Sequence, residues 1–127
     1  MNEYKDKVIL KAVEKITIKN LKEDKKETVL ARIDTGASKS SIGLTLAAEL
    51  HLGPIKSYSK VKNANGITTR PIVEAIIEIG GKKIKEKFTI ANRVNMQYKV
   101  LVGRNVLKNG FLVDTTEEFY NDGDIEE

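Results

Sequence analysis

Asp34 is the residue of this chain whose position points most directly to chemistry, because it follows an apolar stretch and opens the tripeptide Asp34-Thr35-Gly36. This order predicts a carboxylate at the end of a strand, beside a glycine that lets backbone N–H groups approach it closely. The threonine hydroxyl next to it can hold the loop by hydrogen bonding. The same residues also form ordinary turns, so a structural turn after a strand is the alternative interpretation.

Further motifs lie towards the C-terminal end of the chain. An apolar segment leads into Gly103-Arg104-Asn105, and a Phe-Leu-Val-Asp segment ends at Asp114. With Asp34-Thr35-Gly36-Ala37, they resemble the retropepsins, the half-length aspartic proteases of retroviruses. The chain is still more similar to a retropepsin-like family often labelled "ATP-dependent zinc protease", whose Asn-Arg-x-x-Met segment corresponds here to Asn92-Arg93-Val94-Asn95-Met96. The resemblance covers roughly residues 7–114.

The resemblance implies that Asp34 is catalytic and that Thr35, Gly36 and Ala37 form the active-site loop. Peptide hydrolysis by carboxylates needs two of them around one water, one ionised and one protonated. This chain has a single Asp-Thr-Gly, and the nearest second candidate, Asp114-Thr115-Thr116, lacks the glycine. A symmetric homodimer, as in the retropepsins, would bring the second Asp34.

A hairpin tip lies between two predicted strands in the middle of the chain. By resemblance it occupies the place of the retropepsin flap, a lid that covers the substrate and excludes water. Its residues are Asn63, Ala64, Asn65, Gly66 and Ile67.

The Gly103-Arg104-Asn105 motif is expected to open a short helix and to play a structural role. In the retroviral enzymes, the equivalent arginine pairs with an aspartate four residues after the catalytic one. That position is Ser38 here, so Arg104 must have another partner. The resemblance gives no role to Arg93, and Met96 is expected to pack in the core or an interface.

Many short strands with few helices predict an all-β fold, a closed or nearly closed antiparallel barrel of the retropepsin type with one or two short helices. Apolar and polar residues alternate over residues 8–20, and a helix capped by Thr45 is expected to run to residue 52. Gly80-Gly81 predicts a hairpin. The other expected strands are residues 28–33, 38–42, 57–62, 68–79, 82–90 and 111–113.

Charge divides the chain into a basic body and an acidic end. Residues 1–114 hold all 22 basic residues and 12 acidic ones, a net charge of +10, whereas residues 115–127 hold six acidic residues and no basic one. We expect residues 1–114 to form a single domain and residues 115–127 a mobile tail. The lysines are scattered among few aromatic residues, which argues against a nucleic-acid partner.

The composition also limits the chemistry that the chain can perform. It contains no cysteine, and His51 is its single histidine, so neither a metal nor another cofactor is expected. The absence of cysteine suits a cytoplasmic protein, and there is no apolar run long enough for a membrane span. The expected partners are a second copy of the chain and a peptide or protein substrate. Two interpretations remain besides a nucleic-acid-binding barrel: an aspartic endopeptidase, and a retropepsin-like domain that dimerises or binds peptides without cleaving them.

Overall fold

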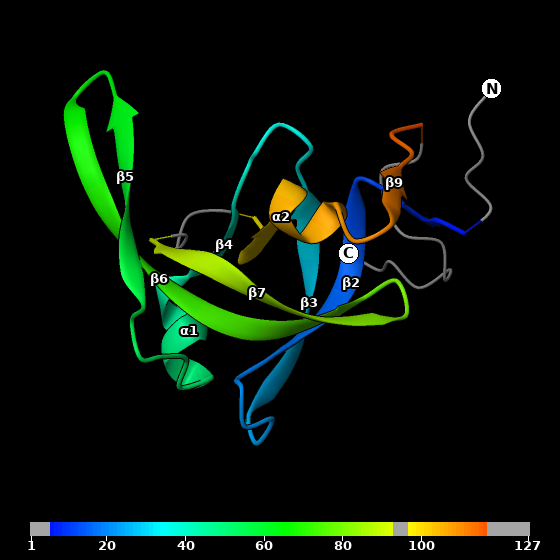
Figure 1. The fold of residues 1–127 in the computed structure, drawn as a ribbon, viewed down its shortest axis with the longest axis horizontal. Coiled ribbons are helices and arrows are strands. Elements are labelled where there is room, and N and C mark those ends of the chain that lie inside the picture. The colour runs from blue at the N-terminus through cyan, green and yellow to red at the C-terminus, as the bar shows by residue number, and fades with distance from the viewer. Residues whose placement is uncertain (1–5, 93–96, 117–127) are drawn as a thin grey trace.

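Six strands close on themselves to form a barrel, and one further strand extends the sheet (Figure 1). The computed structural model describes residues 6–92 and 97–116. Around the barrel each strand pairs with the next, and the last pairs back with the first. The order is β2 (Val13–Lys19), β3 (Lys26–Ile33), β8 (Val100–Val102), β4 (Ser40–Gly43), β7 (Lys82–Ala91) and β6 (Gly66–Ile79), with β5 (Ser57–Asn63) paired to the first half of β6. The predicted closed all-β barrel is confirmed.

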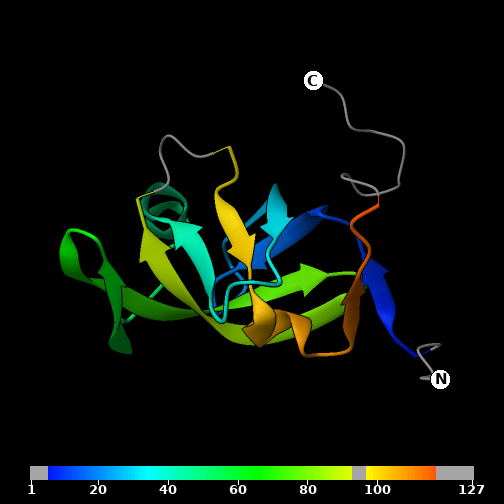
Figure 2. The same cartoon turned by 90° about the horizontal axis from the view of Figure 1, so that it is seen from above.

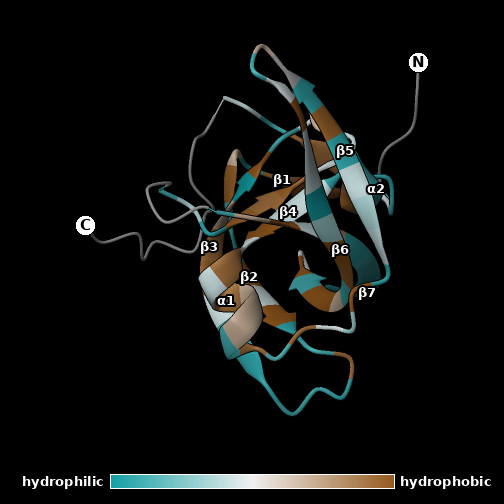
Figure 3. Ribbon diagram, turned by 90° about the vertical axis from the view of Figure 1, so that its left-hand side faces the viewer, coloured by the Kyte–Doolittle hydropathy of each residue, from teal (hydrophilic) through white to brown (hydrophobic). Residues whose placement is uncertain are grey.

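Alternation along the strands fills this barrel with apolar side chains. Successive residues of a strand point to opposite faces, so hydrophobic and hydrophilic residues alternate along the strands in Figure 3. On β6, the inward residues are at most 1% exposed: Val73, Ala75, Ile77 and Ile79. On β7, the outward residues are exposed lysines: Lys83, Lys85 and Lys87.

The strand directions differ in part from the predicted antiparallel arrangement. β3 pairs with β8 in parallel, and so does β4 with β7. Parallel neighbours need long connections instead of tight turns, and other elements intervene between the members of both pairs. The barrel is therefore mixed.

A second, two-stranded sheet joins the two ends of the described chain. β1 (Val8–Leu10) and β9 (Phe111–Val113) pair in parallel. The prediction of one continuous strand over residues 8–20 is wrong at residues 11–12, where the Lys11 N–H donates to the Glu14 carboxylate at 2.6 Å and the strand is interrupted. Figures 1 and 2 place this sheet at the opposite end of the molecule from the β5–β6 hairpin.

The first helix starts earlier than predicted. α1 (Leu44–Glu49) has Gly43 as its N-cap, so the prediction of a Thr45 cap is wrong. The reason is that β4 runs directly into the helix, and the start is set by the end of the strand without a side-chain cap. At the other end, His51 adopts φ 55° and donates its N–H to the Ala48 carbonyl at 3.0 Å, which closes the helix.

The second helix and the hairpins lie where the sequence predicts them. α2 (Arg104–Leu107) follows β8 directly. The β5–β6 hairpin closes with Asn63 paired to Gly66, which leaves Ala64 and Asn65 as its loop. Gly80 and Gly81 form the turn between β6 and β7, both with positive φ.

No helix within residues 6–92 and 97–116 is long and apolar enough to cross a membrane.

Alanine substitutions in the turn between β6 and β7 test how the small sheet is held against the barrel. Both glycines have positive φ, so alanine at either position should cost about 1–2 kcal/mol of unfolding free energy. A Cβ on Gly80 would also lie 2.9 Å from Val8 Cγ1 and 3.0 Å from Phe111 Cε1, whereas a Cβ on Gly81 would meet nothing within 4 Å. Urea unfolding should therefore show Gly80→Ala less stable than Gly81→Ala by a further 1–3 kcal/mol or so. Equal stabilities would contradict the close packing of the turn on β1 and β9.

Candidate active site

Asp34 lies at the C-terminal end of β3, where this strand leaves the barrel. Its backbone N–H donates to the Val102 carbonyl of the neighbouring β8 at 2.8 Å, so the pairing of the two strands continues as far as Asp34. The side chain is half-buried, and the next two residues, Thr35 and Gly36, are exposed. The backbone of Asp34 is thus held by the barrel, and its side chain remains partly exposed beside the loop.

The loop around Asp34 folds back onto its carboxylate. The Gly36 N–H donates to Asp34 Oδ1 at 2.9 Å, which is the contact expected from the sequence. A Cβ at position 36 would lie 3.3 Å from the same oxygen, so glycine permits this close approach. The Ala37 N–H donates to the Asp34 carbonyl at 3.3 Å and completes a tight turn.

Arg104 fixes this loop from α2. Its guanidinium Nη1 donates to the Thr35 carbonyl at 2.9 Å, and its backbone N–H donates to the Ala37 carbonyl at 2.8 Å. Backbone carbonyls therefore take the place of the aspartate that is absent at Ser38. These hydrogen bonds hold the loop on both sides of Gly36.

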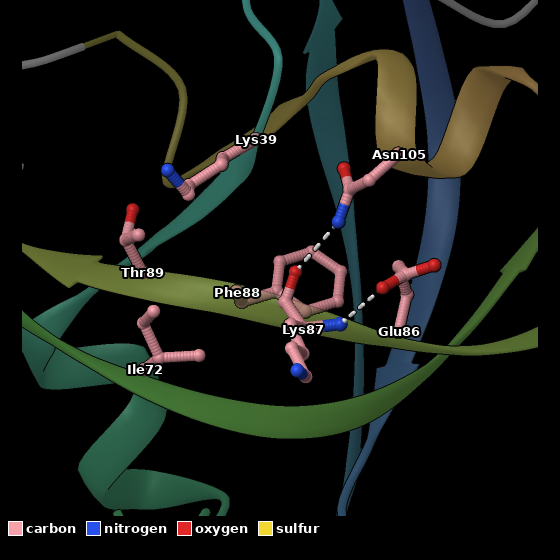
Figure 4. A pocket seen from close by; sticks show the side chains of 7 residues that line it. All are labelled: Lys39, Ile72, Glu86, Lys87, Phe88, Thr89 and Asn105. Atoms are coloured by element: carbon pink, nitrogen blue, oxygen red, sulfur yellow. Dashed lines mark hydrogen bonds between the residues drawn. The ribbon is translucent and has the colours of Figure 1, made fainter. Parts of the chain in front are cut away.

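Ser40 is a positioning residue that no motif in the sequence singles out. Its hydroxyl is fully buried, donates to Asn105 Oδ1 at 2.7 Å, and accepts the Gly103 N–H at 2.9 Å. The Asn105 amide in turn donates to the Lys87 carbonyl of β7 at 2.9 Å (Figure 4). Gly103 leaves no space for a side chain, because a Cβ there would collide with the Lys39 carbonyl. The start of β4, the start of α2 and β7 are thereby joined.

The hairpin residues proposed as a flap lie at the tip of the β5–β6 hairpin. In Figure 1 this hairpin extends away from the barrel, on the side to which the loop after β3 also rises. Its tip is exposed at Ala64, Asn65, Gly66 and Ile67, and Ile67 keeps 60% of its surface exposed.

The second candidate carboxylate, Asp114, is engaged elsewhere. It accepts hydrogen bonds from the Thr116 hydroxyl at 2.6 Å and the Thr116 N–H at 2.9 Å, and it forms an ion pair with Lys11 at 3.4 Å. The Thr116 hydroxyl, then its N–H, then Lys11 lower the pKa of Asp114 from its ordinary value. None of these partners belongs to the loop around Asp34, and Asp114 follows β9 in the small sheet with β1.

The zinc named in the family label would need a group of ligating side chains. Among the residues that the structure describes, no three His, Cys, Asp or Glu side chains are grouped so that they could hold a metal ion. His51 lies at the end of α1, and cysteine does not occur in the sequence. Of the motif at residues 92–96, Arg93 and Met96 lie outside the described residues.

Comparisons with solved structures define the type of fold. A protein of unknown function from Legionella pneumophila superposes with a TM-score of 0.60 over 88% of this chain and 96% of its own, at 22% identity. The EIAV protease, solved with an inhibitor, gives a TM-score of 0.59 over 86% of this chain and 93% of its own, at 16% identity. The simian foamy virus protease gives 0.52 over 74% and 91%, at 13% identity. The barrel is thus of the retropepsin type.

Sequence comparison identifies the family. A family described as the retropepsin-like aspartic endopeptidase RimB matches residues 47–123, which is more than half of the chain. The chain belongs to this RimB-like family. The matched residues begin after Asp34, so the role of Asp34 depends on its own motif and geometry.

Two curated relatives carry a different name. Proteins from Shewanella halifaxensis and Shewanella pealeana, each named probable alpha-L-glutamate ligase, are 30% identical over 78% and 77% of this chain. The chain spans only 28% and 27% of their lengths.

Replacing Ser40 tests the hydrogen bonds that hold the candidate site. Ser40→Ala leaves the Gly103 N–H without its acceptor and Asn105 Oδ1 without its donor, which should cost about 1–3 kcal/mol of unfolding free energy. Ser38→Ala is the matched control, because Ser38 is exposed two residues earlier and should change stability by less than about 0.5 kcal/mol. Urea unfolding of both variants measures the difference. Equal effects would show that the buried hydroxyl does not hold the loop.

Proposed function

We propose that the protein is an aspartic endopeptidase that acts as a homodimer, with one Asp34 from each chain in a shared site. The observation that carries this proposal is the geometry at Asp34. A half-buried carboxylate stands at the end of a barrel strand and accepts the Gly36 N–H at 2.9 Å, and the loop that presents it is fixed by Arg104. The retropepsin-type fold and the family membership support the same class of activity.

In the proposed reaction the two Asp34 carboxyl groups share one proton and hold a water between them. The ionised group takes a proton from the water, and the water oxygen attacks the peptide carbonyl carbon. At the same time the protonated group donates its proton to the carbonyl oxygen. The tetrahedral intermediate then collapses, the C–N bond breaks, and the amine leaves with a proton from the pair. Water supplies the hydroxyl of the new acid and the hydrogen of the new amine, so no other reactant is consumed.

The remaining residues of the site position these groups. The Gly36 N–H fixes the orientation of the carboxylate, and Arg104 and Ser40 hold the loop that carries it. The β5–β6 hairpin is suited to cover an extended peptide, which would pair with it as a strand.

A domain that dimerises or binds peptides without cleaving them is the second candidate. It is favoured by one observation, that residues 35–39, which follow Asp34 in the same loop, include no second acidic residue. The chain spans only 28% of a relative named glutamate ligase. A domain that binds a partner protein without cleaving it would be consistent with such a longer relative.

Asp34→Asn separates the two candidates. The amide keeps the shape of the side chain but cannot share or exchange the proton of the pair, so cleavage of a peptide library should fall by about 100-fold or more. Circular dichroism and sedimentation should remain as in the wild type. Chelators should not change the wild-type rate. Full cleavage by Asp34→Asn, or activity that depends on added zinc, would contradict the mechanism.

The proposed homodimer can be tested by its mass in solution. Because each chain contributes one Asp34, sedimentation at micromolar concentration should give about twice the mass of a single chain. A monomer at every concentration at which peptides are cleaved would rule out the shared site.

A further inference from the structure

Two Asn-Gly pairs occur in the chain, Asn65-Gly66 and Asn109-Gly110, and such a pair can react with itself. The glycine nitrogen attacks the carbon of the asparagine side-chain amide, a new C–N bond forms, and ammonia leaves with the glycine N–H proton. Water then opens the succinimide ring to aspartate or isoaspartate, so one water is consumed and one ammonia is released. Glycine favours this reaction because it has no Cβ to hinder the rotation that brings the two groups together.

Both reacting groups of Asn109-Gly110 are held by hydrogen bonds. The Asn109 side-chain amide donates to the Val106 carbonyl at 2.9 Å and to the Asn105 carbonyl at 3.3 Å. The peptide group that contains the Gly110 nitrogen is fixed by Lys82, whose ammonium donates to the Asn109 carbonyl at 2.7 Å. Attack requires the side chain and the peptide group to turn, so these hydrogen bonds would have to break first.

Exposure to water does not distinguish the two pairs, since Asn65 and Asn109 are both exposed. What distinguishes Asn109 is the attachment of the residue that follows it. The Gly110 carbonyl accepts the Val8 N–H of β1 at 3.0 Å, and a Cβ on Gly110 would collide with the Lys82 ammonium. The second pair is therefore tied to α2, to β7 and to the small sheet.

Asn65-Gly66 lies at the tip of a hairpin that projects from the barrel (Figures 1 and 2). The pairing of β6 with β7 begins at Ile72, so within the described part of the chain residues 66–71 pair with β5 alone. A Cβ on Gly66 would meet nothing within 4 Å. Because two strands without a third are only marginally stable, this tip can open while the core stays folded.

We propose that Asn65 is a site of spontaneous deamidation and that Asn109, in the same dipeptide, keeps its amide. The product at position 65 carries a negative charge in place of a neutral amide. In the isoaspartate form the main chain also gains one methylene, which weakens the pairing of Asn63 with Gly66 that closes the hairpin. The modification does not depend on the proposed function. Its effect on peptide cleavage does, because this hairpin is the proposed flap.

The first experiment measures the rates of the two pairs in the intact protein. The purified chain is incubated at mildly alkaline pH in water enriched in oxygen-18, digested with pepsin in acid, and analysed by tandem mass spectrometry. Base speeds the attack by removing the glycine N–H proton, and the label marks oxygen that entered before digestion. Asn65 should take up the label about 10-fold faster than Asn109, because the hairpin opens more easily. Equal rates, faster uptake at Asn109, or no uptake at Asn65 would overturn the proposal.

The same incubation in concentrated urea separates the fold from the local sequence. Both pairs then lose the contacts of the folded chain, so their rates should agree within about 3-fold. A preference for Asn65 that persists at full size in urea would show that the flanking residues set the rates, and it would overturn the role given to the fold.

Lys82→Met tests why Asn109 is protected. The variant removes the hydrogen bond to the Asn109 carbonyl and keeps an apolar stem, so Asn109 should take up the label about 3-fold faster or more, with Asn65 unchanged. Lys83→Met is the matched control, since it removes the same charge one residue further on, where Lys83 pairs with Glu23. No gain in Lys82→Met, or an equal gain in Lys83→Met, would overturn the restraint assigned to Lys82.

The effect on the hairpin is measured after the deamidated protein is separated by its charge. Amide hydrogen exchange at residues 66–70 should be about 3-fold faster or more in this fraction than in the unmodified one, and peptide cleavage should be slower. Unchanged exchange would overturn the effect on the hairpin, and equal cleavage would overturn the effect on the reaction. Faster exchange with no cleavage by either fraction would overturn the proposed function and leave the modification in place.

Discussion

The arrangement of the candidate site depends on the buried hydroxyl of Ser40. It links Gly103 and Asn105, which lie 63 and 65 residues further along the chain, to the segment that follows Asp34. A buried N–H or amide oxygen without a partner costs about 1–3 kcal/mol, so the two segments are held in one relative position. Gly103 makes this contact possible, because any side chain there would meet the Lys39 carbonyl.

The same links join the loop of Asp34 to β7, a neighbouring strand of the barrel. Asn105 bonds to Ser40 on one side and to the Lys87 carbonyl of β7 on the other. The loop that carries Asp34 and the strand β7 therefore belong to one rigid frame. The β5–β6 hairpin is attached to this frame at Ile72, through its pairing with Thr89 of β7. A substrate would thus lie between a fixed surface and a projecting hairpin.

Much of this arrangement could be predicted from the sequence. Alternating residues identified the strands, Asn65-Gly66 and Gly80-Gly81 identified the turns, and Gly103 located the start of α2, because each signal is local. Contacts between segments far apart in the chain could not be predicted from the sequence. Ser40 resembles any small residue in a short strand, and only its distant neighbours reveal its role. The parallel pairings and the break at residues 11–12 likewise depend on contacts between segments far apart in the sequence.

The central claim, that two chains share one catalytic site through Asp34, is tested most directly by mixing subunits. Equal amounts of wild type and Asp34→Asn are allowed to exchange, and peptide cleavage is measured at fixed total protein. If both Asp34 residues are needed, only wild-type homodimers cleave, and the rate falls to about a quarter of that of pure wild type. A rate of about one half would show that each chain acts alone and would contradict the account.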